Sequence, residues 1–437
     1  MASQGGGVIA RLRSNPAILR IIENSSYLAG EQLLKLIGGL VIGILIARHL
    51  GVHKFGELSF AIAYTGLFGV IGTLGLNRIA VREIVAAREV GEDPRHIVDT
   101  VLCMRLISAL GLVLICIGSA WLLDQGSLLL IAILSPMFLF SSLDIIDLWF
   151  QSQTLAKHTT SARSLSYLVV MGTRVLLLAL GADVMFFALA TLLEYMGAAL
   201  ALFIVYRRSK LRLSVGAYDP GLAKRLIGES WSEIIGGFAG MLYIRLDQIM
   251  LGNMLDDRAV GIFAVASRLS EAWYFVPIAL VASTFPDIVR RRETDPEGYM
   301  RAIANLMRIL TGLSYLVAIV TTVLAPYVIV MLYGPEFSES ATVLTLHIWS
   351  GLFMSLGLAS GSWIMAEKRT RLGLYRNLCG AAVNIVLNLL LIPIWGPIGA
   401  SVATLSSLFM AYMLFDFMVP AMREVSRAKW RALLLLR

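Results

Sequence analysis

Residues 28–56 read LAGEQLLKLIGGLVIGILIARHLGVHKFG, and this stretch decides the fold class. It is an apolar run long enough to cross a bilayer as a helix, yet it contains Glu31 and Lys35, one helical turn apart. A charge near the centre of a bilayer costs about 2.5–3.5 kcal/mol, so such residues usually face a bundle interior or an aqueous cavity. An acidic residue followed four positions later by lysine can also form an ion pair. The stretch therefore predicts a membrane helix with a polar face.

Similar apolar runs recur to the end of the chain. Of its 437 residues 58% are hydrophobic and 15% charged, and the mean hydropathy is +0.78. A soluble core of ordinary size does not need so much apolar surface, so we predict an all-α polytopic membrane protein with about twelve transmembrane helices. Their expected limits are 26–49, 57–77, 98–122, 127–150, 162–181, 184–206, 227–252, 259–284, 302–332, 338–365, 372–393 and 397–420.

Lysine and arginine gather in alternate connections between these spans. The first tail, every second connection and the last tail are rich in them, whereas the intervening connections carry only Arg48, Lys54 and Arg258. Cytoplasmic loops hold the excess of positive residues, so both termini are expected in the cytoplasm. This pattern accounts for the net charge of +8 without a nucleic-acid partner.

An internal repeat is expected from the positions of two short segments. Residues 55–61 (FGELSFA) match 260–266 (VGIFAVA) at an offset of 205. The same offset relates a helical face with Glu31 and Lys35 to a second face that includes Asp247. Two such stripes either line a shared central space or let helices pack closely through glycines. The expected segments are a cytoplasmic N-terminal segment (1–25), an N-lobe of six helices (26–206), a cytoplasmic linker (207–226), a C-lobe of six helices (227–420) and a cytoplasmic interfacial tail (421–437).

Charged residues inside the predicted spans are the candidate site. Lys35, Arg245 and Arg268 would give a cationic interior, which favours an anionic cargo such as a phosphate or pyrophosphate headgroup. The carboxylates that could couple to a proton or a sodium ion, or line the lumen, are Glu31, Glu233, Asp247 and Glu271. We expect no catalytic residues, no metal site and no cofactor apart from a coupling ion, because the three cysteines lack ligand spacing and no GxxxxGK[ST] loop is present.

Other intramembrane polar residues are interpreted as structural. By depth in adjacent spans we expect Arg174 to pair with Glu194, and Arg105 with Asp144. Asp147 is expected to reach the cytoplasmic face. The remaining expectations are interhelical hydrogen bonds from Asn384 and Asn388, a core position for His347, and a kink at Pro277.

Several motifs resemble those of the polysaccharide-type flippases of lipid-linked oligosaccharides. These motifs are RHLG (48–51) with FG (55–56), YIRLDQIMLG (243–252), VGIF (260–263), FP (285–286), LYGPEF (332–337), Asn384 with Asn388, and GPIGASVAT (396–404). The resemblance covers nearly the whole chain. It extends to a superfamily that also holds multidrug/cation antiporters and lipid II flippases, and about twelve spans fit the polysaccharide branch better. It implies two six-helix lobes around a cationic cavity, with Arg245 and Arg268 facing the lumen.

The leading hypothesis is an ion-coupled flippase working by alternating access. Its cargo would be an undecaprenyl-pyrophosphate-linked repeat unit of O-antigen, capsule or exopolysaccharide. An exporter of small amphipathic cations is the alternative within transport. A membrane-embedded sugar polymerase or ligase is less favoured, because no sizeable external loop is present, and we expect no enzyme. The protein would act as a monomer in the bacterial plasma (inner) membrane, with the lipid-linked oligosaccharide and a polysaccharide polymerase as its partners and no nucleic acid.

Overall fold

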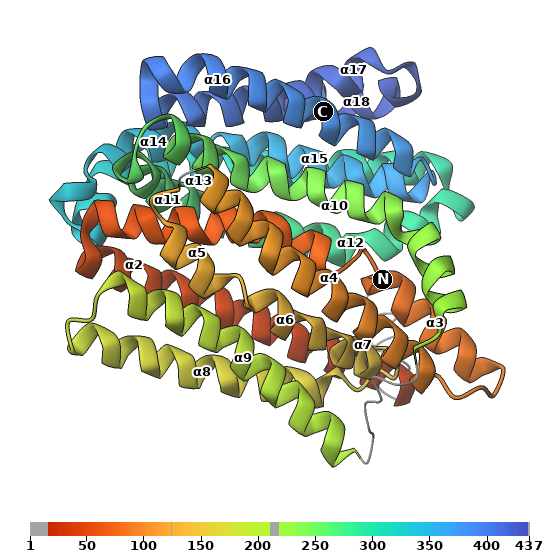
Figure 1. Ribbon diagram of the computed structural model, residues 1–437. Coiled ribbons are helices and arrows are strands. Elements are labelled where there is room, and N and C mark those ends of the chain that lie inside the picture. Colours follow the sequence, from red (N-terminus) through yellow and green to blue (C-terminus); the bar gives the residue numbers. More distant parts are fainter. Residues whose placement is uncertain (1–15, 124, 210–217, 436–437) are drawn as a thin grey trace. The chain divides into compact units, whose positions relative to one another are not determined.

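The computed structural model describes residues 16–123, 125–209 and 218–435, and every regular element in these residues is a helix (Figure 1). The helices before residue 210 are α2 (Pro16–Gly72), α3 (Asn77–Glu89), α4 (Arg95–Leu122), α5 (Leu128–Leu134), α6 (Met137–Ser141), η1 (Ser142–Asp144), α7 (Ile145–Gln151), α8 (Ala156–Ala179) and α9 (Val184–Arg208). Those after residue 217 are α10 (Pro220–Met254), α11 (Asp257–Ala272), α12 (Phe275–Thr294), α13 (Pro296–Tyr333), η3 (Pro335–Phe337), α14 (Glu339–His347), α15 (Ser350–Ala366), α16 (Thr370–Phe409), η4 (Met410–Leu414), α17 (Phe415–Met418), η5 (Pro420–Met422) and α18 (Arg423–Leu433). The expected N-terminal segment 1–25 and linker 207–226 lie partly outside the described residues.

Ten helical segments within the described residues are long and apolar enough to cross a membrane. Two of them contain a glycine whose backbone is not helical: Gly51 in α2 (φ 71°, ψ 175°) and Gly396 in α16 (φ 55°, ψ −133°). Each of these two segments is long enough for two spans, so dividing them at the glycines gives the expected total of twelve. The eighth expected span is broken between α11 and α12, close to Pro277, which confirms the predicted kink. The all-α polytopic fold is therefore confirmed.

The contacts divide the chain into two compact units. The first unit is the chain up to Gly43 together with Thr65–Phe238, and the second is Ile44–Tyr64 together with the chain from Ala239 onward. The tip of the first helical hairpin therefore packs with the second half of the sequence. The bounds of these compact units differ from those of the predicted lobes, 26–206 and 227–420. The division into two six-helix lobes stays a prediction that is based on the internal repeat.

A close helix contact explains why residues 44–64 belong to the second unit. A Cβ added at Gly56 of α2 would overlap the carbonyl oxygen of Asp257 and lie 2.9 Å from the amide nitrogen of Gly261. A Cβ added at Gly261 of α11 would overlap the carbonyl oxygen of Val52. The offset of 205 relates position 52 to 257 and position 56 to 261. The contact is thus reciprocal, as it is when equivalent segments pack about a two-fold axis, and it supports the predicted repeat.

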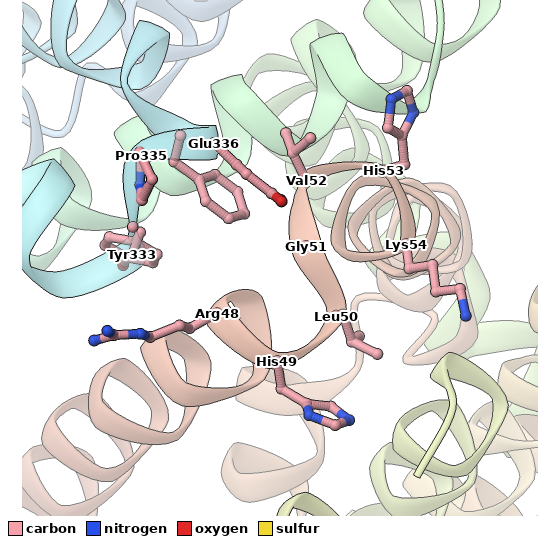
Figure 2. Close-up of a pocket in the computed structure, with 12 residues that line it drawn as sticks. Arg48, His49, Leu50, Gly51, Val52, His53, Lys54, Tyr333, Pro335 and Glu336 are labelled. Carbon is pink, nitrogen blue, oxygen red and sulfur yellow. The ribbon is translucent and has the colours of Figure 1, made fainter. Parts of the chain in front are cut away.

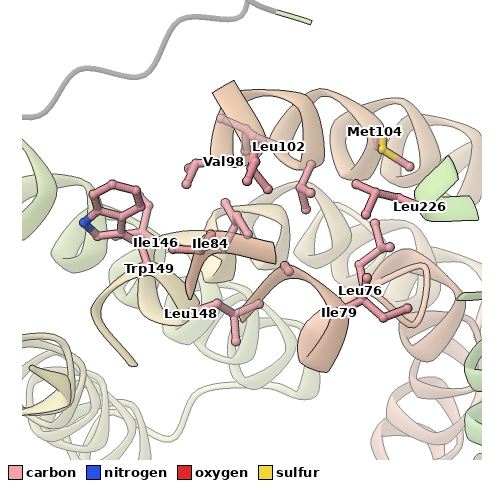
Figure 3. Packing of buried hydrophobic residues seen from close by; sticks show 14 of the residues in the cluster. Leu76, Ile79, Ile84, Val98, Leu102, Met104, Ile146, Leu148, Trp149 and Leu226 are labelled. Carbon is pink, nitrogen blue, oxygen red and sulfur yellow. The ribbon is translucent and has the colours of Figure 1, made fainter. Parts of the chain in front are cut away.

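The core of the first unit forms where α3, α4, α7 and α10 meet (Figure 3). Ile84 of α3, Val98 of α4 and Ile146 of α7 are fully buried there, and Leu226 adds the start of α10. Trp149 packs edge-on against Tyr206 of α9, with ring centroids 6.4 Å apart. The residues on either side of Asp147 in α7 belong to this cluster, so the cluster holds Asp147 in place.

The C-terminal helix α18 is anchored to the second unit by a buried lysine. Lys429 donates to the backbone oxygen of Tyr412 at 2.6 Å, in the π-helical turn η4, and to the buried carboxylate of Asp416. Burial lowers the pKa of the Lys429 ammonium to about 8, so it is still mostly protonated at neutral pH. Tyr315 of α13 also donates to the Leu433 carbonyl at 2.9 Å. The tail expected at 421–437 therefore forms an ordered helix over Arg423–Leu433.

Candidate functional site

Four charged side chains of the first unit form one connected cluster. The ammonium of Lys35 lies 2.8 Å from Glu31 Oε1. Arg163 of α8 donates to Glu31 Oε2 and to Asp147 Oδ2, both at 2.7 Å, and so joins α2 to α7. Both carboxylates are buried, whereas the side chain of Lys35 is 42% exposed. The cluster is formally neutral, and Lys35 is its accessible member.

One prediction about neighbouring charges is wrong, and two agree with the structure. Asp147 does not extend to the surface but is buried against Arg163, a residue at the start of the expected span 162–181. Arg105 is also buried; it donates to Asn77 Oδ1 at 2.7 Å and interacts electrostatically with Asp144, the expected partner. The predicted pair is present between Arg174 and Glu194 at 2.9 Å. Arg163 was missed because α8 begins six residues before the expected span, which carries this side chain two turns into the helix.

Asp247 of α10 is a buried carboxylate held by neutral groups in the second unit. Asn388 Nδ2 donates to its Oδ1 at 2.5 Å, and the hydroxyl of Thr404 donates to Oδ2. The bond from Asn388 to Asp247 links α16 to α10, as predicted, and within α16 Asn388 also donates to Asn384 Oδ1 at 3.1 Å. Asn388 and Thr404 are both neutral, so their dipoles help to offset the negative charge of Asp247.

This cluster around Asp247 is rich in oxygen atoms that could accept a cation. Asn388 Oδ1 is buried and has no hydrogen-bond partner among the described residues. The Thr404 hydroxyl also lies 3.0 Å from the Ala400 carbonyl, and its single proton can satisfy only one of its two acceptors. Hard cations prefer carboxylate, amide, hydroxyl and carbonyl oxygens. A proton or a small hard cation bound in this cluster would neutralise the Asp247 carboxylate.

Arg245, Arg268 and Glu271 lie in the same unit and are half-buried. Glu271 interacts electrostatically with Arg245 and, less strongly, with Arg268. The guanidinium of Arg268 lies over the ring of Phe55, 5.0 Å from the centroid. The Nε of Arg245 is buried and lacks a hydrogen-bond partner within the described residues. Arg245 is thus an intramembrane cation whose hydrogen bonds are incomplete.

The structure does not bring all the predicted site residues into one group. Lys35 and Glu31 belong to the first unit, whereas Arg245 and Arg268 belong to the second, so a shared cationic cavity stays a prediction. Glu233 is exposed on the part of α10 that packs with the first unit. His347 is buried in the core beside Phe263, with ring centroids 5.6 Å apart.

A pocket of about 590 Å³ lies in the second unit at the break in α2 (Figure 2). It is lined by residues 48–54 and 333–337. Figure 2 shows Glu336 pointing toward Gly51, while Arg48 extends below Tyr333. The pocket lies at the C-terminal end of α13 (Pro296–Tyr333), and the arginine-rich end of α12 lies near the other end of α13. One wall includes the RHLG motif (48–51) and the other includes most of the LYGPEF motif (332–337). Both motifs resemble those of the flippases.

The fold and these charges define a class of protein. The described residues contain ten membrane-length helical segments, two of them long enough for two spans, and these hold buried carboxylates and a half-buried, incompletely bonded arginine; such features are typical of a polytopic membrane transporter. The chain belongs to the family described as polysaccharide biosynthesis protein, which matches residues 21–291. A second family, MatE, matches residues 234–390.

Individual proteins agree with this assignment. The probable flippase AglR of Haloferax volcanii is 28% identical over 214 residues, which cover 46% of this chain and 44% of that protein. The probable low-salt glycan biosynthesis flippase Agl15 of the same organism is 20% identical over 208 residues, covering 47% and 44%. The matched regions thus span less than half of these relatives.

Solved structures match over almost the whole chain. The lipid II flippase MurJ in an inward closed conformation has a TM-score of 0.69 at 14% identity, covering 95% of this chain and 91% of that one. An inward-facing multidrug resistance transporter of the MATE family has a TM-score of 0.72 at 14% identity, covering 91% and 96%. At this identity the likeness concerns the fold.

Proposed function

We propose that this protein is a flippase that moves polyprenyl-pyrophosphate-linked oligosaccharides across a membrane by alternating access. The family supports this proposal, and so do the names of the two relatives in Haloferax volcanii. The observation that carries it is Arg245, which a membrane span holds half-buried with an unpartnered Nε. An intramembrane arginine needs water, a counter-ion or an anionic ligand, and its planar fork suits a phosphate.

The cargo class follows from the chemistry such a protein must manage. A flippase shields a charged, sugar-bearing headgroup while the prenyl tail stays in lipid. Arg245 and Arg268 would hold the pyrophosphate, with Lys35 as a further cation on the first unit. We propose undecaprenyl-linked repeat units of O-antigen, capsule or exopolysaccharide as the cargo, in the bacterial plasma membrane. The termini would lie in the cytoplasm, as the alternation of basic connections predicts.

We further propose that Asp247 takes up the coupling ion. Its carboxylate is buried and accepts hydrogen bonds from the neutral side chains of Asn388 and Thr404, and Asn384 Oδ1 belongs to the same hydrogen-bonded cluster. Uptake of a proton or a sodium ion would neutralise the charge and change how these side chains bond. Because Asn388 and Thr404 lie on the two halves of α16, that change would be passed to both.

Liposomes test the proposal directly. The purified protein is reconstituted with a fluorescent prenyl-pyrophosphate oligosaccharide, and transfer between leaflets is followed by quenching from outside. Arg245→Ala and Arg268→Ala are expected to slow transfer about tenfold or more, because each removes a partly desolvated charge that contacts phosphate. Arg308→Ala is the matched control, since this arginine of α13 donates to Asn305 at an exposed position. No transfer by the wild type across several such cargoes refutes the function.

The MatE match over residues 234–390 favours one second candidate, an exporter of amphipathic cations. Arg245 and Arg268 would repel such a cargo unless their charge were offset by Glu271. The same liposomes, loaded with ethidium in place of the lipid, separate the two candidates. Export of ethidium without lipid transfer would select the exporter.

A further inference from the structure

A separate pocket of about 480 Å³ lies in the first unit between the start of α2 and the start of α8. Gly30 and Glu31 contribute from α2, and two successive turns of α8 form the opposite wall. The polar part of the lining consists of Ser26, Tyr27, Glu31, Thr160, Ser161 and Ser164. The apolar part consists of Leu165 and Leu168. A volume of this size is in the range of small-molecule sites.

One hydroxyl in this wall has no partner. Thr160 is 2% exposed, and its Oγ1 is buried without a hydrogen bond to any described residue. Most buried hydroxyls are paired, because an unmade hydrogen bond costs about 1–3 kcal/mol. An unpaired hydroxyl in the wall of a pocket points to a ligand that supplies the missing partner.

The apolar part of the pocket continues onto an exposed face of α8. Leu165 is 64% exposed and Leu168 is 48% exposed, and Val169 beside them is also exposed. In a membrane span, exposed apolar side chains face hydrocarbon. The pocket therefore suits a ligand with a hydroxylated part and a hydrocarbon part.

We propose that this pocket binds the first sugar of a lipid-linked oligosaccharide, the sugar next to the pyrophosphate. The inference rests on the proposed function and adds a binding site on the first unit. Glu31 accepts hydrogen bonds from the sugar hydroxyls, and the hydroxyl of Thr160 pairs with another. Lys35 lies one turn further along α2, about 6 Å, and its exposed ammonium receives the neighbouring phosphate. The prenyl chain passes over Leu165 and Leu168 into the lipid.

Two substitutions probe the pocket with little risk to the fold. Thr160→Val keeps the side-chain volume and removes a hydroxyl that makes no hydrogen bond, so the unfolding temperature should stay unchanged or rise. Gly30→Leu fills the pocket, and no atom lies within 4 Å of a Cβ added there. The matched controls are Thr173→Val and Gly172→Leu on α8, because both positions lie outside the pocket lining.

Binding is measured in nanodiscs with two fluorescent probes, a polyprenyl-pyrophosphate disaccharide and the same polyprenyl pyrophosphate without sugar. Thr160→Val is expected to weaken binding of the sugar-bearing probe about threefold to tenfold, and Gly30→Leu more strongly. Thr160→Val and Gly30→Leu should bind the sugarless probe as the wild type does. Both control variants should bind both probes at the wild-type level.

The outcomes separate this inference from the proposed function. If wild-type liposomes transfer the lipid and both variants bind the disaccharide probe normally, the pocket is not the sugar site and the flippase stands. If the variants weaken the binding of both probes equally, the pocket holds the lipid phosphate or the prenyl chain, and the sugar assignment is overturned. A wild type that binds but does not transfer the probe contradicts the flippase and leaves the site supported.

Discussion

Replacing Gly56 with alanine tests the contact that joins the first hairpin to the second unit. The added Cβ would overlap the carbonyl oxygen of Asp257 and lie 2.7 Å from its carbonyl carbon. Ordinary Cβ contacts begin near 3.4 Å, so even the carbon contact is about 0.7 Å too short. The obstructing atoms are backbone, and no side-chain rotation relieves the overlap. α2 and α11 must therefore separate.

The expected cost follows from two opposing effects. Overpacking of a tight contact typically costs about 1–3 kcal/mol, and a backbone obstruction belongs at the upper end of that range. Alanine regains up to about 1 kcal/mol over glycine in a helix interior. Gly312 of α13 has no atom within 4 Å of an added Cβ, so Gly312→Ala should show the gain alone. The two variants should differ by about 2–4 kcal/mol in stability.

Thermal unfolding of the purified protein in detergent, followed by tryptophan fluorescence, measures this difference. Gly56→Ala is expected to unfold several degrees below Gly312→Ala. Gly261→Ala should lower the stability about as much as Gly56→Ala. The double variant should lose less stability than the sum of the two single losses, because both substitutions separate the same two helices. If Gly56→Ala is as stable as Gly312→Ala, the reciprocal contact and the repeat that it supports are refuted.

Three further predictions concern buried charges. Arg163→Met leaves two buried carboxylates without this cation and should cost about 3–5 kcal/mol; an unchanged unfolding temperature would contradict the cluster. Lys429→Met leaves the buried Asp416 without its closest cation, so limited proteolysis should release the C-terminal helix, and resistance equal to the wild type counts against the anchor. Asp247→Asn keeps the side-chain size, so stability should change by less than about 2 kcal/mol while ion-dependent transport is lost; retained ion dependence would remove Asp247 from coupling.

Much of the fold could be predicted because the bilayer limits what the chain can do. Apolar runs of membrane length predict spans, and only helices satisfy their own backbone in lipid. The connections at Gly51 and Gly396 fell between the expected spans for the same reason. Position along the sequence also predicted the pair between Arg174 and Glu194, because adjacent antiparallel spans place equal depths side by side.

The charge partners were harder to predict, because they depend on helix rotation and on exact helix ends. Arg163 is only the second residue of the expected span 162–181, yet the helix starts at Ala156 and carries it inward to Asp147. Arg105 interacts electrostatically with Asp144, as its depth predicted, but its hydrogen bond goes to Asn77. A sequence gives depth to within a turn, whereas an ion pair needs agreement to within a few ångströms.

The repeat keeps its packing contact but not its charges. The offset of 205 takes Gly56 to Gly261, yet it takes Glu31 to Gly236 and Asp247 back to Ile42. In the first unit Arg163 pairs with the buried carboxylates of Glu31 and Asp147, whereas in the second unit Asp247 accepts hydrogen bonds from neutral groups. Coupling requires a ligand that binds two states with different free energies. In the proposed flippase, a carboxylate that is already paired with a cation offers an ion little to gain, so Asp247 would carry the coupling.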